Sequence, residues 1–262
     1  MRENRVKAKM KQGKLAIGTY VYLTDPALIE IIGIAGFDAA FIDMEHTSFD
    51  LNLIEGMIRT CDLVGITSFV RVPDNNPKTI LRILDMGAQA IQVPHIASRD
   101  DALEVVKAVR YAPQGERGMA TSSRAARYGS IPPKEHIETS NAEILLAVMV
   151  EDMKVIKEIE DIASIEGLDL IAVGPSDLSQ AMGVSDRSDP RMKHAIDSIT
   201  ERIKMVGKAK MTFPLNHPVY PLDASELQGM GVAYANCGPN VFKRLLNSYQ
   251  EQVKDIESKL VS

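Results

Sequence analysis

The amino-acid sequence predicts an α/β fold, a single (β/α)8 TIM barrel domain spanning residues 1–262, and two observations carry that prediction. Eight short runs are apolar at consecutive positions, as the strands of a parallel sheet covered on both faces require. Segments of helical periodicity separate these runs. A length of 262 residues also allows two small domains, but no linker composition divides the chain.

The predicted strands are spread along the whole chain. They lie near residues 15–20, 38–43, 67–71, 89–93, 144–150, 169–173, 208–213 and 232–236. Because strand and helix alternate eight times, a closed barrel is favoured over an open, doubly wound sheet.

Capping residues mark the first helices between these strands. Asp25-Pro26 opens one that ends at Gly36, and proline suits that position because its missing N–H would have no partner there. Asn76-Pro77 opens another that ends at Gly87, and Ser98 resembles the cap of a third. Further helices are expected at 51–61, 153–165, 191–206, 223–230 and 241–260.

The segment 111–141 does not fit as a plain loop. It is rich in glycine, proline and arginine, and a stretch of that length in a compact domain usually carries function or short helices of its own.

Composition excludes several classes of protein. Hydrophobic residues make up 45% of the chain, enough for a substantial core, yet no run is long enough to cross a membrane. With a net charge of −5 and no tryptophan, neither a basic surface nor stacking platforms for nucleic acid are expected. The basic start lacks the apolar stretch of a secretory signal. Cys61 and Cys237 suggest neither a disulfide framework nor a metal site, so we expect a cytoplasmic protein.

Charged side chains cluster at or just past the carboxyl ends of four predicted strands. They are Asp43, Glu45 and His46 for the second strand, Arg71 for the third, Glu151 for the fifth and Asp177 for the sixth. Parallel strands of a barrel bring their carboxyl ends to one rim, so we expect these side chains to meet there and form the site of an enzyme.

Glu151 and Asp177 are the candidate metal ligands. Two carboxylates, completed by water and substrate oxygens, suit Mg²⁺ or Mn²⁺. The alternative is that each only caps or salt-bridges the helix that follows it.

His46 is the candidate general base, because imidazole titrates near neutral pH, and Asp43 or Glu45 could orient it. A solvated loop histidine is the alternative. Arg71 offers a planar fork for a substrate carboxylate. Its alternative role is an ion pair with Asp43 or Asp85.

The turn from Gly174 through Ser176 to Asp177 exposes backbone N–H groups that can bind an anion. His95, Asn216, His217 and Asn236 follow other strand ends and are expected to line the same mouth. There is no dinucleotide fingerprint, P-loop or nucleophile elbow, and no lysine placed for an imine. A metal-stabilised enolate is therefore preferred to a lysine imine.

Several segments together resemble the HpcH/HpaI aldolase family, the metal-dependent class II 2-oxoacid aldolases. In family order they are 35–38 (AGFD), 42–46 (IDMEH), 70–73 (VRVP), 83–88 (ILDMGA), 93–94 (VP), 110–118 (RYAPQGERG) and 174–179 (GPSDLS). Together they extend over about two thirds of the chain, which makes the match far more specific than any single motif.

The resemblance implies a barrel whose last helix is exchanged between subunits, in dimers that assemble to a hexamer. It implies a divalent cation, Mg²⁺ or Mn²⁺, on Glu151 and Asp177, holding a small 2-oxo acid. Asp85 would belong to the contact between subunits.

The same resemblance implies roles for the other residues at the rim. Arg71 would stabilise the enolate oxygen, and His46, paired with Asp43, would relay protons. Ser176 would bind the substrate carboxylate through its backbone N–H in the loop that begins at Gly174. Asn216 is expected as a further substrate contact.

Met149 stands where family aldolases typically carry a glutamine, two residues before the metal-binding glutamate. The carboxyl-terminal third also differs from that expected of the sugar-acid aldolases. Together with Met149, this difference favours a branch of the family that looks similar to this chain and makes citrate from oxaloacetate and acetyl-CoA for siderophore biosynthesis. The alternative is an aldolase releasing pyruvate from a 4-hydroxy-2-oxo acid, of the 2-dehydro-3-deoxyglucarate or 4-hydroxy-2-oxoheptanedioate type. A non-catalytic barrel that binds a dicarboxylate is a third hypothesis.

Overall fold

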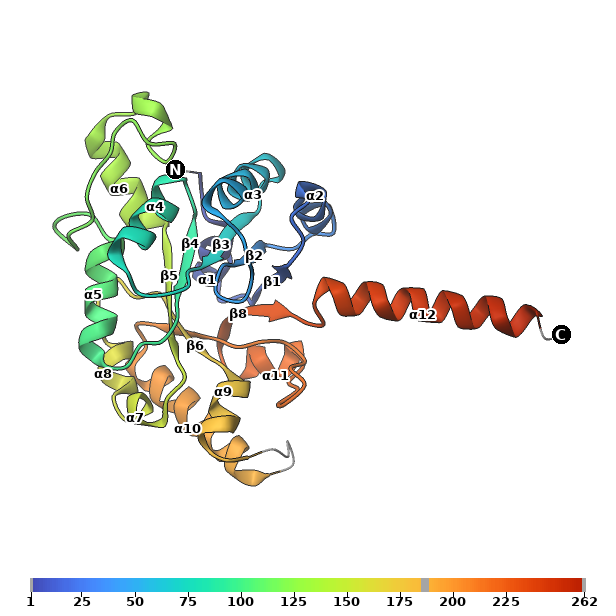
Figure 1. The fold of residues 1–262 in the computed structure, drawn as a ribbon. Coiled ribbons are helices and arrows are strands. Elements are labelled where there is room, and N and C mark those ends of the chain that lie inside the picture. The colour runs from blue at the N-terminus through green and yellow to red at the C-terminus, as the bar shows by residue number, and fades with distance from the viewer. Residues whose placement is uncertain (1, 185–188, 261–262) are drawn as a thin grey trace.

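The structure, a computed structural model, describes residues 2–184 and 189–260. Its eight parallel strands close into a barrel in sequence order, each paired with the next and β8 with β1 (Figure 1). The strands are β1 (Ala16–Val21), β2 (Ala39–Asp43), β3 (Thr67–Arg71), β4 (Ala90–Val93), β5 (Leu145–Val150), β6 (Leu170–Val173), β7 (Lys210–Thr212) and β8 (Val232–Cys237). The predicted (β/α)8 barrel is thereby confirmed.

Most of the helices surround the barrel on its outer side, whereas α1 (Arg5–Lys11) lies at its amino-terminal end and α12 (Val241–Leu260) extends away from it (Figure 1). Between these two, the chain forms α2 (Pro26–Ile34), α3 (Leu51–Val64), α4 (Pro77–Asp85), α5 (Arg99–Val109), the 3₁₀ turn η1 (Arg127–Gly129), α6 (Pro133–Glu143), α7 (Met153–Ile156), α8 (Ile159–Ala163), α9 (Pro175–Ala181), α10 (Pro190–Val206) and α11 (Ala224–Gly229). None of these helices within the described residues is both long and apolar enough to span a membrane.

The apolar runs form strands because both faces of the sheet are covered. Every residue of β2 and of β5 is buried, which explains why these runs do not alternate with polar residues. One apolar cluster fills the barrel interior and includes Phe41, Phe69 and Tyr234. A second, larger cluster lies between the sheet and the helices.

The predicted helix starts are confirmed where a cap was recognised. The side chains of Asp25, Asn76 and Ser98 accept backbone N–H groups in the first turns of α2, α4 and α5. These bonds satisfy donors that have no partner inside a helix.

Other helix predictions needed correction. The helix expected over 153–165 is two short helices, α7 and α8, separated at Lys157 and Glu158. At this break Arg202 donates to the Lys157 carbonyl over 3.0 Å. The sequence pattern also missed α1 and α9, whereas the segment 111–141 does hold a 3₁₀ turn and most of α6.

The amino-terminal end of the barrel is closed by α1 and fixed by ion pairs. Asp38 precedes β2 and is fully buried, and its carboxylate meets Arg5 at 3.0 Å and Lys9 at 2.7 Å. Lys7, on the same helix, meets Asp169 at 2.8 Å just before β6. The short helix therefore ties the chain start to two strands far away in sequence.

The last helix leaves the barrel. Figure 1 shows α12 projecting into solvent, with the carboxyl terminus at its far end. It has no buried residue, although large apolar side chains recur along it. The exposed set is Phe242, Leu245, Leu246, Tyr249, Val253, Ile256 and Leu260.

Candidate active site

The last residues of two neighbouring strands form the centre of the site. Asp43 ends β2, Arg71 ends β3, and the two lie opposite each other in the parallel register. Arg71 donates from Nε to Asp43 Oδ1 over 2.9 Å and from Nη2 to Oδ2 over 2.5 Å. Burial alone would lower the pKa of Arg71, but the hydrogen bonds and charge of Asp43 outweigh it and raise that pKa. The guanidinium is thus a permanent, fixed cation.

A chain of polar contacts continues around the rim from strand to strand. Glu45 lies 2.9 Å from Arg71 Nη1 through Oε2 and 2.9 Å from His95 Nε2 through Oε1. His95 follows β4 with a φ of 58°, and its backbone N–H donates to Glu151 Oε1 over 3.3 Å. A positive φ is unusual for histidine, and here it turns both the ring and the N–H towards carboxylates.

His46 lies at the edge of the cavity with an exposed side chain. Its backbone N–H donates to Asp43 Oδ1 over 3.4 Å, but its ring does not meet that carboxylate. Ring Nε2 lies 3.8 Å from Glu45 Oε2. The expected His46–Asp43 side-chain pair is therefore not formed, because Arg71 occupies Asp43 and Glu45 is the carboxylate nearest the imidazole.

Glu151 and Asp177 lie beyond two neighbouring strands, β5 and β6. Burial raises the pKa of the Glu151 carboxyl, and the nearby charge of Asp177 raises it further, so the two carboxylates are close enough to interact. Neither caps a helix: Asp152 caps α7, and α9 starts at Gly174 without a side-chain cap. The capping alternative is thus not realised, although Asp177 does lie in the first turn of α9.

The two carboxylates fit a hard divalent cation that takes most of its ligands from water and substrate. A Cβ on Gly174 would come 2.7 Å from Asp177 Oδ2, so glycine leaves the room this carboxylate occupies. Among residues 2–184 and 189–260, no three His, Cys, Asp or Glu side chains gather so as to hold a metal ion alone. Mg²⁺ and Mn²⁺ match such a sparse oxygen site better than zinc does.

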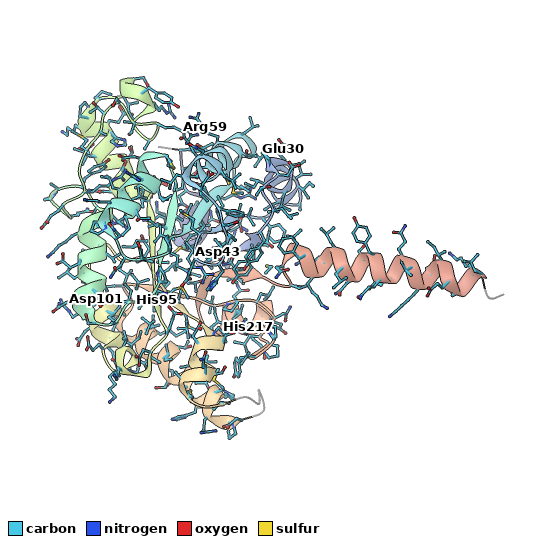
Figure 2. All side chains as sticks on the ribbon, viewed as in Figure 1. Glu30, Asp43, Arg59, His95, Asp101 and His217 are labelled. Carbon is cyan, nitrogen blue, oxygen red and sulfur yellow. The ribbon has the colours of Figure 1, made fainter. Side chains whose placement is uncertain are left out.

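A cavity of about 330 Å³ opens at this end of the barrel. Charged or polar lining residues include His46, Arg71, Gln92, Ser176, Asp177, Thr212, His217 and Asn236. Tyr20, Tyr22, Phe41, Met149 and Phe213 supply aromatic and apolar walls. Figure 2 shows Asp43, His95 and His217 around the middle of the barrel, whereas Glu30, Arg59 and Asp101 lie on outer helices.

The loop after β6 faces this cavity. Ser176 and Gly174 both line it, and the Ser176 hydroxyl lies 3.3 Å from His217 Nε2. Burial lowers the pKa of His217, although the Asp177 charge partly opposes that change. A neutral imidazole therefore lies next to the exposed backbone of the loop.

Two residues predicted from the sequence lie elsewhere. Asn216 is exposed, has a φ of 51° and does not line the cavity, whereas Asn236 does. Asp85 ends α4, away from the strand ends that form the mouth, and pairs with the buried Arg117 over 2.7 Å. A role for Asp85 between subunits stays a prediction.

Sequence reasoning gave Glu45 only a supporting role and did not single out Tyr20. Glu45 lies two residues beyond Asp43, the last residue of β2, so its position near a strand end could have ranked it higher. Tyr20 lies inside its strand, where its inward direction depends on the pleat of β1.

Residues 16–213 match the family model described as HpcH/HpaI aldolase/citrate lyase. The chain belongs to this family. It is 34% identical over 206 residues to a 5-keto-4-deoxy-D-glucarate aldolase of Citrobacter koseri, covering 78% of this chain and 79% of that relative. The predicted family is confirmed, and with it the prediction of an enzyme.

Solved structures extend the likeness beyond residue 213. The citrate synthase SbnG superposes with a TM-score of 0.86 at 28% identity, covering 99% of this chain and 100% of that one. An HpcH/HpaI aldolase/citrate lyase family protein from Burkholderia cenocepacia J2315 gives a TM-score of 0.84 at 26% identity, covering 96% and 99%. Family and neighbours together support carbon–carbon bond chemistry, of either the aldolase or the citrate synthase kind.

Proposed function

We propose that the protein makes citrate from oxaloacetate and acetyl-CoA, in support of siderophore biosynthesis in the cytoplasm. The observation that carries the proposal is a single cavity bounded by a fixed cation, Arg71, and by Asp177 of an interacting carboxylate pair with Glu151. A small anionic 2-oxo acid fits between a guanidinium and a cation held by carboxylates.

Glu151 and Asp177 would hold Mg²⁺ or Mn²⁺, which, when bound, polarises the 2-oxo group of the substrate. Arg71 keeps N–H groups free of Asp43 and Glu45, because five donors serve only three contacts with these carboxylates. Those free groups donate to the oxygen that gains charge. The backbone N–H of Ser176, next to Gly174, binds the substrate carboxylate.

His46 takes the proton that leaves the methyl group of acetyl-CoA. Its exposed ring can reach a substrate in the cavity, and Glu45 stabilises the imidazolium that forms. The resulting carbon attacks the keto carbon of oxaloacetate, and the carbonyl electron pair moves to oxygen, which then takes a proton. Water hydrolyses the thioester to release citrate and the free thiol of coenzyme A.

Two observations support citrate synthesis over aldol cleavage. Met149 lines the cavity with its sulfur 3.9 Å from Arg71 Nη1, so an apolar group stands beside the cation where the family's aldolases are expected to have an amide. The fold also matches SbnG along essentially the whole chain, including the carboxyl-terminal third.

Cleavage of a 4-hydroxy-2-oxo acid to pyruvate is the second candidate. It is supported by 34% identity to 5-keto-4-deoxy-D-glucarate aldolases over most of the chain. In aldol cleavage, His46 takes the proton of the substrate hydroxyl group. The carbon–carbon bond then breaks, and the electron pair of that bond forms the enolate of pyruvate.

We further propose that the chain works as an oligomer in which α12 packs on a neighbouring subunit, in dimers that assemble to a hexamer. The exposed apolar side chains of α12 support this arrangement, because such a stripe is costly in water.

The deciding experiment incubates the purified protein and Mg²⁺ or Mn²⁺ with oxaloacetate and acetyl-CoA. Thiol release should match citrate formation, measured by mass spectrometry, and both should be lost in His46→Ala and Arg71→Ala. Pyruvate from a 4-hydroxy-2-oxo acid without thiol release would replace citrate synthesis by aldol cleavage. Turnover in neither assay would leave the non-catalytic, dicarboxylate-binding barrel.

A further inference from the structure

Three polar side chains of β1 and β8 form a line from the closed barrel interior to the cavity. Tyr234 lies deep in the barrel and is fully buried, Asn236 follows two residues later on β8, and Tyr20 faces Asn236 from β1. The two strands are hydrogen-bonded neighbours, with Gly18 opposite Asn236 in the register. Asn236 and Tyr20 both line the cavity.

The direction of the first hydrogen bond follows from burial. Tyr234 Oη lies 2.6 Å from Asn236 Oδ1, a separation typical of a hydroxyl that donates to an oxygen. Were the amide turned round, its nitrogen would donate to Tyr234, and no other acceptor among the described residues receives the buried hydroxyl proton. An unsatisfied buried donor costs about 1–3 kcal/mol, so the amide oxygen faces Tyr234.

The contact between Asn236 and Tyr20 then has only one possible direction. With its oxygen on Tyr234, Asn236 presents its amide nitrogen towards the Tyr20 hydroxyl, a contact that opposes the rise in the Tyr20 pKa caused by burial. An amide nitrogen can only donate, so the Tyr20 oxygen is the acceptor. The proton of Tyr20 is therefore not taken up by Asn236 and can point into the cavity that Tyr20 lines.

The surroundings hold Tyr20 in place and keep it protonated. Its ring packs edge-on against Phe41 at 5.2 Å and stacks on Tyr22 at 5.7 Å between centroids. Burial raises the pKa of Tyr20, although the Arg71 charge partly opposes that change. Tyr20 and Arg71 line the same cavity, and the hydroxyl stays a donor at neutral pH.

Gly18 makes this arrangement possible. A Cβ at residue 18 would lie 2.0 Å from Tyr234 Oη, so any larger residue would displace the hydroxyl that orients Asn236. The ring of Tyr234 is also packed against Phe69, with centroids 4.9 Å apart.

We propose that Tyr20 is a further catalytic residue, whose hydroxyl donates to the 2-oxo oxygen of the substrate beside Arg71. Asn236 and Tyr234 are positioning residues that aim this donor. The assignment deepens the proposed function and rests on it, but it holds for both candidate reactions. In citrate synthesis the 2-oxo oxygen becomes an alkoxide, and in aldol cleavage it becomes an enolate oxygen, so negative charge grows at the same atom.

The first test measures binding of oxalate, which carries a negative charge where an enolate oxygen would lie, against binding of pyruvate, in the presence of Mn²⁺. In Tyr20→Phe we expect oxalate affinity to fall about tenfold or more while pyruvate affinity changes less than about threefold. Equal loss for both ligands, no loss, or no oxalate binding to the unmodified protein would overturn the assignment.

The second test measures kcat and KM in variants that remove the Tyr20 hydroxyl or reverse the hydrogen-bond direction at residue 236. Asn236→Asp keeps the shape of the side chain but offers only acceptors, so Tyr20 turns its proton to residue 236 and away from the substrate. We expect Tyr20→Phe and Asn236→Asp each to lower kcat roughly tenfold or more with little change in KM, and the double variant to be no worse than either. Tyr234→Phe should give a smaller loss, because the amide is then free to turn.

Tyr128→Phe, on an exposed tyrosine far from the cavity, is the matched control and should behave as the unmodified protein. Thermal unfolding of every variant separates misfolding from a lost donor. If the losses of kcat in the two single variants multiplied in the double variant, or if Tyr20→Phe kept full kcat, the catalytic role of Tyr20 would be refuted. The proposed function would remain intact. Absence of turnover in the unmodified protein would instead refute the proposed function, and the oxalate comparison would still decide the role of Tyr20.

Discussion

Arg71 and Asp43 are held together by two hydrogen bonds between the facing ends of adjacent strands. Because β2 and β3 end in register, neither side chain needs a loop to bring it to the other. The fully buried carboxylate holds one edge of the guanidinium, and the remaining N–H groups are directed to Glu45 and to the cavity. The pair is therefore better described as one rigid unit, in which Asp43 holds the guanidinium that faces the cavity, than as two separate catalytic residues.

Asp43→Asn should impair catalysis chiefly through Arg71. The amide can accept only one of the two guanidinium bonds and leaves the cation without its buried counter-charge, so we expect kcat/KM to fall about 10²-fold. Steady-state kinetics with oxaloacetate and acetyl-CoA measure this. Asp50→Asn, which changes only an exposed helix cap of α3, should retain kcat/KM within about threefold. An Asp43→Asn enzyme of full activity would show that Arg71 does not need this partner.

Glu151→Gln should weaken the binding of a divalent cation. It removes one of only two carboxylates available to the ion, so the dissociation constant for Mn²⁺, measured by titration calorimetry or electron paramagnetic resonance, should rise at least about tenfold. Asp152→Asn alters the neighbouring carboxylate, which caps α7, and should bind Mn²⁺ as before. Unchanged affinity in Glu151→Gln would remove the cation from this site.

Met149→Gln should shift the balance between the two candidate reactions. The introduced amide would lie beside Arg71, where the sulfur is now 3.9 Å from Nη1, and could hydrogen-bond a bound 2-oxo acid. We expect the ratio of pyruvate release to citrate formation to rise about tenfold, measured with both substrate sets. Met205→Gln, on an exposed side chain, is the control. No change in that ratio would show that residue 149 does not discriminate between the reactions.

Breaking the apolar face of α12 should dissociate the proposed assembly. Leu246→Glu with Val253→Glu places two charges on that face, so the mass measured by light scattering should fall towards that of a monomer. Asn247→Glu adds a charge to the same helix outside the exposed apolar set and should leave the mass unchanged. A protein that is monomeric before any substitution would contradict the exchange of α12.

His136 should make stability depend on pH. Burial lowers its pKa in the folded protein, where only 1% of the residue is exposed and its Nε2 lies 3.0 Å from the Tyr111 hydroxyl. Below about pH 6.5 the unfolded chain then binds a proton that the folded chain resists, so the free energy of unfolding falls as pH falls.

One such group contributes at most about 1.4 kcal/mol per pH unit. Urea unfolding at pH 7.5 and 5.5 should therefore show a smaller decline for His136→Gln than for the unmodified protein. His194→Gln, on the exposed surface of α10, should keep the full decline. An identical decline in all three proteins would exclude His136 as its source.

The strands could be predicted closely because each is an apolar run buried on both faces, a property that depends little on which strands are neighbours. The predicted strand at 67–71 matches β3, and that at 38–43 includes all of β2. The single helix expected over 153–165 is interrupted at Lys157, where Arg202 from a distant helix donates to the backbone carbonyl. No local pattern encodes that contact.

The site was predictable as a set of residues but not as a set of contacts. Strand ends identified Asp43, Arg71, Glu151 and Asp177, since a parallel barrel brings such ends together. Which carboxylate faces His46 depends on side-chain directions after β2, and there Glu45 is nearer than Asp43. Tyr20 escaped notice because an inward-facing tyrosine within a strand looks, in sequence, like any other core aromatic.

The ion pairs that secure α1 under the barrel lie at the end opposite the cavity. Asp38, Lys7 and Asp169 hold the scaffold together without touching a residue that faces the substrate. Side chains at the mouth can therefore be exchanged at little cost to the stability of the barrel, because the ion pairs that hold α1 do not involve them.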